Sequence, residues 1–485
     1  LERVTTGSLE ALRIYAEAAQ YIDRGGNPLD GATRLREAVK LDTTFAMAYR
    51  KLGVALSNAG MPRSGVDSAL ERAYRYRNRL TDRERLLTEG SYFGNGPGRD
   101  RREAAKAYEA LLKLDPNENA AANNLANIYS GRRDFAKAES LFKAFIATGR
   151  STAQQYNNLT AALFNQGKLD EAERVSKEFV QRFPTAVSGP TQPLQFLYAR
   201  GRLDSMELIY REQIKSPSVG DKIGGTFGMS NLLLYRGRIA ESQRYRDNGI
   251  ALQRSLGVPP NPALNDSLSE SWGDLLLYDD TASAVRRVER TIASTNLKSI
   301  PFERRPYLGL TGFFAATGNV AKARQYLAEW EAGIPDSVTR RTIINNKHSG
   351  LAAIALAEKK YDVALREAWA SDTTYDGPDG NCETCIMGDI AEIHADAGAA
   401  DSAIYYFEKR LNTAAPNMFG NDAFNKARFV RELAQQYEKK GDAVNAAKYY
   451  RLFIAQWEHA DARLQPKVAD AKRRLSRLAD IERKP

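Results

Sequence analysis

The chain contains few of the residues on which metal and catalytic sites depend. Its 485 residues include only two cysteines and three histidines. The histidines His348, His394 and His459 are scattered, and we expect each to lie on a helix surface or in packing. Nucleophile-elbow, phosphate-loop and zinc-protease motifs are absent from the sequence. We therefore expect a protein that is not an enzyme and that binds neither a cofactor nor a metal ion.

Long apolar runs and strand-like runs are also scarce. No stretch approaches the roughly 20 apolar residues of a membrane-spanning helix, so we expect no membrane span in this chain. No signal peptide is recognisable, and because the chain begins with Leu1 we expect that an upstream segment has been removed, cleaved or left out of the sequence. The net charge of +10 is modest for a long surface. It permits acidic partners, and we expect no nucleic acid partner.

What the sequence does contain is an internal repeat between Ala104 and Pro184. Small and bulky residues recur there at a step of about 34 residues. The matched sets are Ala104, Ala138 and Ala172; Tyr108 and Phe142; and Leu125 and Leu159. A step of this length predicts that each unit is one pair of helices, which must stack on its neighbours to bury its apolar face.

The unit that begins near Tyr156 shows the physical reason for the spacing. Tyr156, Leu159 and Leu163 fall on one face of a first helix, at steps of three and four residues. Gly167 supplies the turn, where a positive φ costs no Cβ clash. The small Ala172 then lets the second helix approach the first closely. We therefore predict an all-α fold of antiparallel helix pairs.

These residues resemble the tetratricopeptide repeat (TPR) family over nearly the whole chain. The resemblance implies a right-handed superhelical solenoid. A narrower resemblance links Val4–Arg13, Trp457–Pro466 and the region of Cys382 to the repeat region behind bacterial membrane-anchored serine/threonine kinases. No kinase motif is present in this chain. This narrower resemblance implies a bacterial sensing or scaffold module and favours an extracytoplasmic compartment over the cytoplasm.

Turn and proline signals divide the predicted solenoid into parts. We expect a regular N-terminal array over residues 1–255, a proline-rich linker or bend over residues 256–262, and a less regular array over residues 263–463. A capping helix follows over residues 464–485, with an apolar face and a basic face. At this period the chain holds about eleven or twelve units.

The two cysteines, Cys382 and Cys385, are three positions apart, and this spacing leaves three interpretations open. They can be inert thiols, they can form a disulfide if the compartment is oxidising, or they can serve metal or catalytic chemistry. A four-ligand zinc site needs two more ligands, and the nearest histidine is His394.

Asparagines on the first helices are the best candidates for a binding site. Asn124 and Asn158 are one repeat apart and are expected to stand one above the other. The full candidate set is Asn123, Asn124, Asn127, Asn157, Asn158 and Asn165. An amide both donates and accepts hydrogen bonds, which suits an extended peptide backbone; the alternative is solvated polar filler. Asparagine ladders of this kind bind peptides in the TPR family, so the resemblance adds weight to a peptide site.

The leading hypothesis is therefore a non-enzymatic scaffold that binds a protein or peptide in the concave groove of a solenoid. The alternative is a structural protein that assembles head to tail into homo-oligomers or filaments, because repeat arrays with exposed apolar ends can stack on one another.

Overall fold

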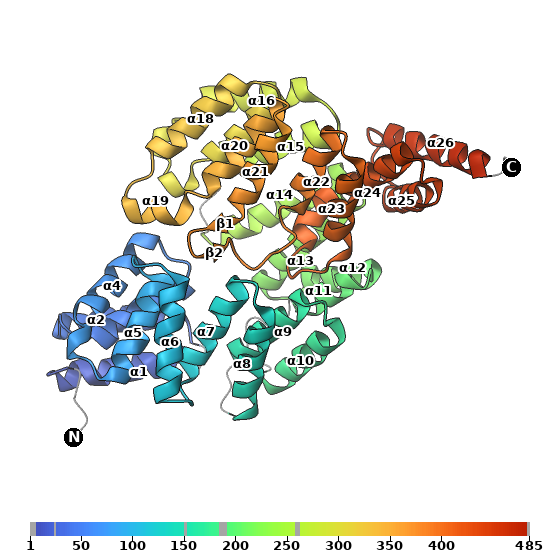
Figure 1. Cartoon of the computed structure of the whole chain (residues 1–485). Helices are drawn as coiled ribbons and strands as arrows, with labels where there is room; N and C mark the ends of the chain where they lie inside the picture. The colour runs from blue at the N-terminus through green and yellow to red at the C-terminus, as the bar shows by residue number, and fades with distance from the viewer. Residues whose placement is uncertain (1–5, 24–25, 150–152, 184–191, 258–261, 483–485) are drawn as a thin grey trace. The chain divides into compact units, whose positions relative to one another are not determined.

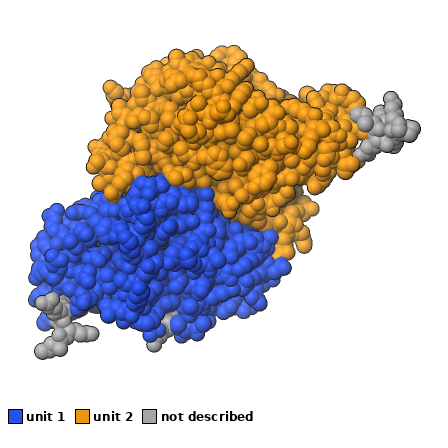
Figure 2. Space-filling model, in the orientation of Figure 1, with its two compact units in different colours: residues 1–190, 374–381 blue, residues 191–373, 382–485 orange. Residues whose placement is uncertain are grey.

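A computed structural model describes residues 6–23, 26–149, 153–183, 192–257 and 262–482. The described residues form 26 α-helices, short 3₁₀ turns and one pair of two-residue strands, so the predicted all-α fold of helix pairs is confirmed (Figure 1). Pro184, the first five residues and the prolines at 259 and 260 lie outside the described residues. The chain divides into two compact units, residues 1–190 with 374–381 and residues 191–373 with 382–485 (Figure 2).

The first unit contains ten helices that follow one another as five pairs. Their bounds are α1 Leu9–Asp23, α2 Pro28–Leu41, α3 Ala46–Asn58, α4 Arg63–Arg75, α5 Asp82–Asn95, α6 Arg101–Leu114, α7 Asn119–Gly131, α8 Phe135–Ala147, α9 Ala153–Asn165 and α10 Leu169–Arg182, with a 3₁₀ turn over Arg77–Arg79. Each helix packs on the next, and each odd-numbered helix also contacts the next odd-numbered helix. The odd-numbered helices therefore line the inner face of this unit.

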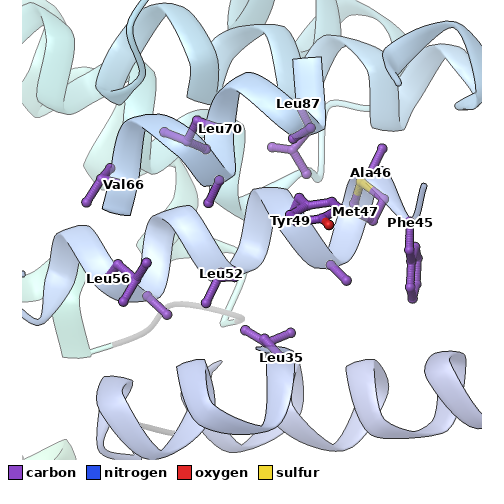
Figure 3. Packing of buried hydrophobic residues seen from close by; sticks show 14 of the residues in the cluster. Leu35, Phe45, Ala46, Met47, Tyr49, Leu52, Leu56, Val66, Leu70 and Leu87 are labelled. Carbon is purple, nitrogen blue, oxygen red and sulfur yellow. The ribbon is translucent and has the colours of Figure 1, made fainter. Parts of the chain in front are cut away.

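The repeating residues of the first unit form its core. Ala104, Ala138 and Ala172 are fully buried, and their small side chains lie where paired helices meet. The larger residues fill the space between pairs: Tyr108 and Phe142 are both about 1% exposed. Burying a side chain of this size contributes roughly 1.5–3 kcal/mol. Figure 3 shows the same packing around α3, where aliphatic side chains of neighbouring helices interdigitate.

Turns between paired helices follow the predicted chemistry. Gly167 has φ +72° and nothing within 4 Å of the place where a Cβ would stand, so its role is conformational. Its N–H bonds to the carbonyl of Phe164 at 2.9 Å, which closes the end of α9. The position before a helix is often a capping residue: Asp134 accepts a hydrogen bond from the backbone N–H of Lys137 at 3.4 Å.

A buried carboxylate joins successive pairs of the first unit. Glu139 on α8 accepts hydrogen bonds from Lys143, from Lys168 and from Gln166, and the last two lie at the α9–α10 turn. Burial raises the pKa of Glu139, but these hydrogen bonds and the two ammonium charges outweigh it and lower the pKa to about 2. This contact therefore stabilises the stacking of one helix pair on the next.

Most of a hairpin late in the sequence, residues 374–381, belongs to the first unit. Its strands are β1 Thr373–Thr374 and β2 Gly377–Pro378. Arg101, the first residue of α6, donates to the Asp376 carboxylate through Nε and Nη2 at 2.9 and 2.7 Å and to the Pro378 carbonyl at 2.7 Å. No pattern in the sequence predicted this strand pair.

The second unit contains the remaining sixteen helices. Their bounds are α11 Gln192–Ala199, α12 Leu203–Lys215, α13 Val219–Tyr235, α14 Ile239–Ser255, α15 Ala263–Leu276, α16 Thr281–Ala293, α17 Tyr307–Ala316, α18 Val320–Ala332, α19 Ser337–Ile343, α20 Asn346–Ala357, α21 Tyr361–Ser371, α22 Met387–Asp396, α23 Ala400–Asn412, α24 Phe419–Lys440, α25 Ala443–Gln456 and α26 Gln465–Glu482. Two 3₁₀ turns, over Leu297–Ser299 and Phe302–Arg304, separate α16 from α17.

The second unit also brings distant parts of the sequence together. Helix α13 packs along α24, about 200 residues later in the chain. The turn before α26 continues this contact, because the N–H of Asp461 donates to the Gly237 carbonyl at 3.0 Å. The Asp461 carboxylate in turn accepts the N–H of Ala240 at 2.9 Å, and Lys467 pairs with Asp279 at 2.8 Å. The C-terminal part of the second unit therefore contacts two earlier turns of the same unit, at Gly237 and at Asp279.

The last helix has the two faces that the sequence predicted. Val468, Ala471 and Leu478 are buried against the C-terminal core, and Leu475 packs at its border. Lys472, Arg473 and Arg477 on the other side are exposed, whereas Arg474 lies at the edge of the buried face and pairs with Glu438 at 2.8 Å. The domain limits predicted from the sequence, including the bend at residues 256–262, stay predictions, since residues 258–261 are outside the described range.

The close contact at Gly237 leads to a test of the second unit. Gly237 has φ +73°, and a Cβ there would lie 2.7 Å from the Cβ of Ala460. Gly237→Ala should cost about 3 kcal/mol, because overpacking adds to the cost of the left-handed backbone. Gly201→Ala is the matched control, since Gly201 has φ +69° and open space around it. It should cost about 1 kcal/mol. Equal losses in thermal unfolding would show that the Ala460 contact is unimportant.

The low pKa of Glu139 predicts a pH dependence. The unfolded side chain titrates near 4.3 and the folded one near 2, so the carboxylate stabilises the fold above about pH 4.3 and this stabilisation disappears as the pH falls towards 2. Glu139→Gln should therefore cost about 2 kcal/mol at pH 7 and almost nothing at pH 2. Urea unfolding at several pH values measures this cost in free energy of unfolding. Glu37→Gln, at an exposed glutamate, is the control. A loss that does not depend on pH would contradict the assignment.

Candidate functional site

The structure places the candidate asparagines on the inner face of the first unit. Asn123 and Asn124 lie on α7, and Asn157 and Asn158 lie on α9. The side-chain amide of Asn158 donates to the Asn123 Oδ1 atom at 3.2 Å, so amides of consecutive repeats do meet. The pairing differs from the predicted one by one residue, because Asn158 bonds to Asn123 and not to Asn124. Asn124 instead donates to the hydroxyl of Tyr108 at 3.1 Å.

Two further candidates, Asn127 and Asn165, take no part in these contacts between repeats. Asn127 is exposed and has no hydrogen bond to any part of the chain that the structure describes. Asn165 donates to the carbonyl of Ala161 in its own helix at 2.9 Å. The candidate set therefore contains a connected row, Asn123, Asn124 and Asn158, with Asn157 beside Asn158 on α9, while Asn127 and Asn165 stand apart from the row. We call Asn123, Asn124 and Asn158 the asparagine row.

The asparagine row is held in place by neighbouring polar groups. Gln154 on α9 donates to the Asn158 Oδ1 atom at 2.8 Å, and Asn123 donates to Asn124 at 3.3 Å. The Tyr108 hydroxyl at the other end is buried. Burial raises the pKa of Tyr108, and the hydrogen bonds from its neighbours and the nearby charge of Arg50 act in the opposite direction. The row thus consists of amides that neighbouring hydrogen bonds hold in place.

Arg50 is a residue that the sequence analysis did not single out. It lies on α3, and ten of the thirteen residues of this helix are buried, which conceals any periodic pattern. The adjacent Lys51 is also buried. A charged pair within such an apolar helix was the signal that could have identified this position.

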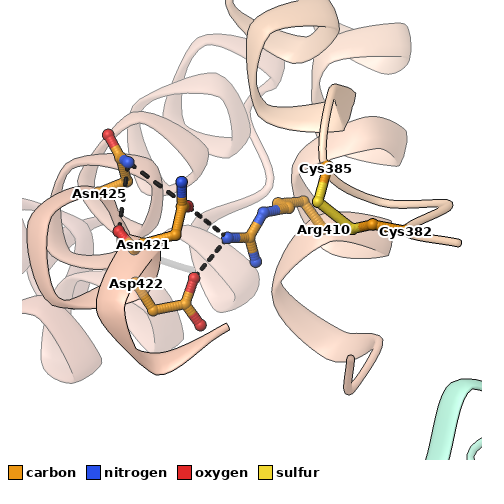
Figure 4. Close-up of a disulfide and its surroundings, with 6 residues drawn as sticks. All are labelled: Cys382, Cys385, Arg410, Asn421, Asp422 and Asn425. Atoms are coloured by element: carbon orange, nitrogen blue, oxygen red, sulfur yellow. Dashed lines mark hydrogen bonds and ion pairs between the residues drawn. A yellow bond between two sulfur atoms is a disulfide. The ribbon is translucent and has the colours of Figure 1, made fainter. Parts of the chain in front are cut away.

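The second unit contains a separate buried polar network. Arg410 and Asp422 form an ion pair at 2.5 Å with 3% and 8% of their side chains exposed, and Asn421 also accepts from Arg410 at 2.9 Å (Figure 4). The Tyr198 hydroxyl donates to the other oxygen of Asp422. Burial raises the pKa of Tyr198, and the adjacent Asp422 charge raises it further. The Lys426 ammonium lies 5.1 Å from the centre of the Tyr198 ring, where a cation–π contact is favourable.

A cavity of about 200 Å³ borders this network. Its walls include Tyr198, Met206, Tyr210 and Phe419. Gln195 and Asn417 at its edge bond to each other at 3.0 Å. The lining mixes apolar side chains with the amides of Gln195 and Asn417 and shows no catalytic arrangement, so we describe it as a cavity of the fold.

The two cysteines form a disulfide in the structure, the second of the three interpretations left open by their spacing. The S–S distance is 2.09 Å, and no other cysteine exists in the chain (Figure 4). Glu383 between them pairs with Lys409 of α23 at 2.8 Å. The loop closed by the disulfide is therefore also held to α23 by a salt bridge.

The histidines do not converge on a site. His348 pairs with Glu367 at 2.7 Å, whereas the His394 ring stacks on Tyr406 with 5.5 Å between ring centres. Burial lowers the pKa of His394. Within the described ranges, no three residues of the kinds that bind metals lie close together. None of the helices that are described has both the length and the apolar character needed to cross a membrane.

The comparisons with known proteins give distant structural matches alone. No protein-family model matches the chain, and no curated protein matches it. Two similar solved structures are the crystal structure of the APC/C hetero-tetramer Cut9–Hcn1 and the human IFIT1 dimer with m7Gppp-AAAA. The first is 12% identical, with a TM-score of 0.33 over 95% of this chain and 96% of that one. The second is 13% identical, with a TM-score of 0.34 over 93% of this chain and 90% of that one.

At this level of similarity neither structure indicates a function for this chain. The fold itself is a TPR-type helical solenoid, as its paired and stacked helices show. The narrower resemblance to kinase-associated repeats, and with it the bacterial origin and the compartment, stays a prediction.

The different environments of the asparagines predict different costs of removal. Asn124→Ala should reduce stability by about 1 kcal/mol relative to Asn127→Ala, because the buried Tyr108 hydroxyl loses a partner. The control, Asn127→Ala, removes no contact and should change stability by less than about 0.5 kcal/mol. Both changes raise helix propensity on the same helix, so their difference isolates the hydrogen bond. Chemical unfolding of both variants measures this difference in stability. Indistinguishable midpoints would contradict the hydrogen bond from Asn124 to Tyr108.

Proposed function

We propose that this protein is a non-enzymatic scaffold that binds an extended peptide segment of a partner protein along the inner face of its first unit. The observation that supports this most directly is the asparagine row, in which Asn158 bonds to Asn123 across two consecutive repeats. A row of fixed amides presents donors at intervals along one face, and an extended backbone presents carbonyl groups that match them.

The site is suited to binding without chemistry. Its polar groups are amides and hydroxyls that bond to one another, and no nucleophile with an adjacent base occurs among them. Fixed amides cost little entropy on binding because neighbouring hydrogen bonds already hold them. The disulfide between Cys382 and Cys385 supports an oxidising, extracytoplasmic compartment for this scaffold.

Head-to-tail assembly has less support. The apolar face of α26 is already buried within the second unit, where Val468 and Ala471 are each about 1% exposed. A capped end of this kind removes the apolar surface that stacking of whole chains would need. Self-assembly therefore stays an alternative that the sequence suggested, and sedimentation of the purified chain tests it.

Replacement of Asn124 and Asn158 by alanine tests the proposed function. Twelve-residue peptides selected by display against the full chain provide the probes, and fluorescence anisotropy measures their affinity. The double variant should bind about tenfold more weakly, which corresponds to about 1.4 kcal/mol. Helix content by circular dichroism should not change.

Asn127→Ala is the control for this experiment, since Asn127 lies on α7 outside the asparagine row. It should leave affinity within about twofold of the original value. Unchanged affinity in the double variant would remove the asparagine row from the binding site.

A further inference from the structure

The cavity of the second unit lies among α11, α12 and the start of α24. Its volume is about 200 Å³, and Tyr198, Tyr210 and Phe419 supply its aromatic walls. Met206 adds a flexible thioether, which adapts to ligands of irregular shape. Space that the chain itself leaves beside apolar side chains costs stability, because the lining atoms lack contacts on one side. A ligand of the right size supplies those contacts.

Tyr210 on α12 brings to this cavity a hydroxyl without a partner. The residue is only 5% exposed, and its hydroxyl forms no hydrogen bond within the part of the chain that the structure describes. Burial raises the pKa of Tyr210 to about 12, so the hydroxyl keeps its proton at neutral pH and can donate it. A buried donor without an acceptor carries a desolvation cost. A ligand with a hydrogen-bond acceptor offsets that cost.

Two glycines of α13 fix the position of Tyr210. A Cβ at Gly228 would overlap the Tyr210 ring, and a Cβ at Gly225 would lie 2.7 Å from the Tyr210 carbonyl oxygen. Both the ring and the backbone of this residue therefore pack directly on the backbone of α13. A ring held in this way is a preorganised wall, and a ligand pays little entropy to order it.

The walls of the cavity include no charged side chain. The charged groups behind Tyr198 belong to the polar network already described: Asp422 pairs with Arg410 and accepts the Tyr198 hydroxyl. The Lys426 ammonium lies 5.1 Å from the centre of the Tyr198 ring. A charged ligand would lose its hydration in the cavity without gaining a counter-charge from the walls. The lining therefore favours a neutral ligand.

Two amides mark the side on which the cavity meets solvent. Gln195 on α11 donates to the Asn417 Oδ1 atom at 3.0 Å, and Asn417 is exposed. Asn417 has φ +61°, a conformation that asparagine adopts more readily than most residues. Water readily replaces an exposed hydrogen bond of this kind, so its net contribution to stability is small. The edge can therefore open to admit a small molecule.

The volume limits the size of the ligand. An apolar cavity of about 150 Å³ in another protein binds benzene. The present cavity is somewhat larger, so it suits one aromatic ring with a small substituent. Its aromatic walls favour an aromatic ligand, because pairs of rings contribute more than the area that they bury.

We propose that the cavity of the second unit is a binding site for a small neutral aromatic molecule, with a hydrogen-bond acceptor of the ligand bound to the Tyr210 hydroxyl. This proposal goes beyond the proposed function, since it concerns a different ligand and none of the residues of the asparagine row. It stands or fails independently of peptide binding.

The test uses the full chain and three probes in saturation-transfer difference NMR titrations at pH 7.4. Acetophenone is neutral and carries an acceptor, isopropylbenzene has a similar shape without an acceptor, and benzoate is charged. Acetophenone should bind with a Kd of about 1 mM or tighter. Benzoate should bind at least about tenfold more weakly, because the walls offer no counter-charge. Equal affinities for benzoate and acetophenone, or no binding of acetophenone at about 10 mM, would overturn the proposal.

Tyr210→Phe tests the hydrogen bond, because it removes the hydroxyl and keeps the ring. It should weaken acetophenone binding by about fivefold and leave isopropylbenzene within about twofold. Thermal stability should not fall, since the hydroxyl has no partner in the described chain. Tyr245→Phe is the matched control: Tyr245 on α14 packs against the same core and does not line the cavity. It should change neither affinity. Equal effects of Tyr210→Phe on both probes would show that the hydroxyl is not the donor.

Ala415→Leu tests whether the probes occupy this cavity. Ala415 lines the cavity, so the larger side chain should reduce the affinity for both neutral probes by about tenfold. Ala414→Leu makes the same change at the adjacent residue, which is not part of the lining, and should leave both affinities within about twofold. Circular dichroism checks that both variants fold. Undiminished binding in Ala415→Leu would place the probes elsewhere and overturn the proposal; if this variant does not fold, the nearly isosteric Tyr210→Phe decides.

Discussion

Every helix pair in this chain has one apolar face that it cannot bury alone, and this constraint governs the whole structure. Fully buried alanines at Ala104, Ala138 and Ala172 let paired helices approach, and bulky residues such as Phe142 then fill the space between pairs. Stacking is therefore required for folding, and it leaves the inner face of the odd-numbered helices free of the demands of the core. Polar residues can stand there at little cost in stability.

Polar contacts decide how the stacked pairs are held in register. Glu139 bonds to the next turn of the first unit, and its low pKa shows that the carboxylate is strongly stabilised there. The second unit uses a buried pair, Arg410 and Asp422, together with the Tyr198 hydroxyl from a helix far away in the sequence. Such contacts require accurate geometry, so they add specificity to an apolar core that tolerates variation.

The two polar clusters differ in one respect that bears on function. In the second unit the buried guanidinium has its carboxylate, and the network is complete within the chain. In the first unit the buried Arg50 lacks one. A complete network stabilises the fold, whereas a buried charge without a partner opposes folding.

The sequence by itself determined the helix pairs, their period, the turn at Gly167 and the two-faced last helix, because these depend on local spacing and on one residue's backbone freedom. It also selected the asparagines, although it did not foresee that Asn158 would bond to Asn123. Only the tertiary structure decided that α13 packs on α24, that Arg101 holds Asp376, and that Arg50 is buried without a partner. These features join residues from distant parts of the chain, and no local periodicity records which distant groups will meet.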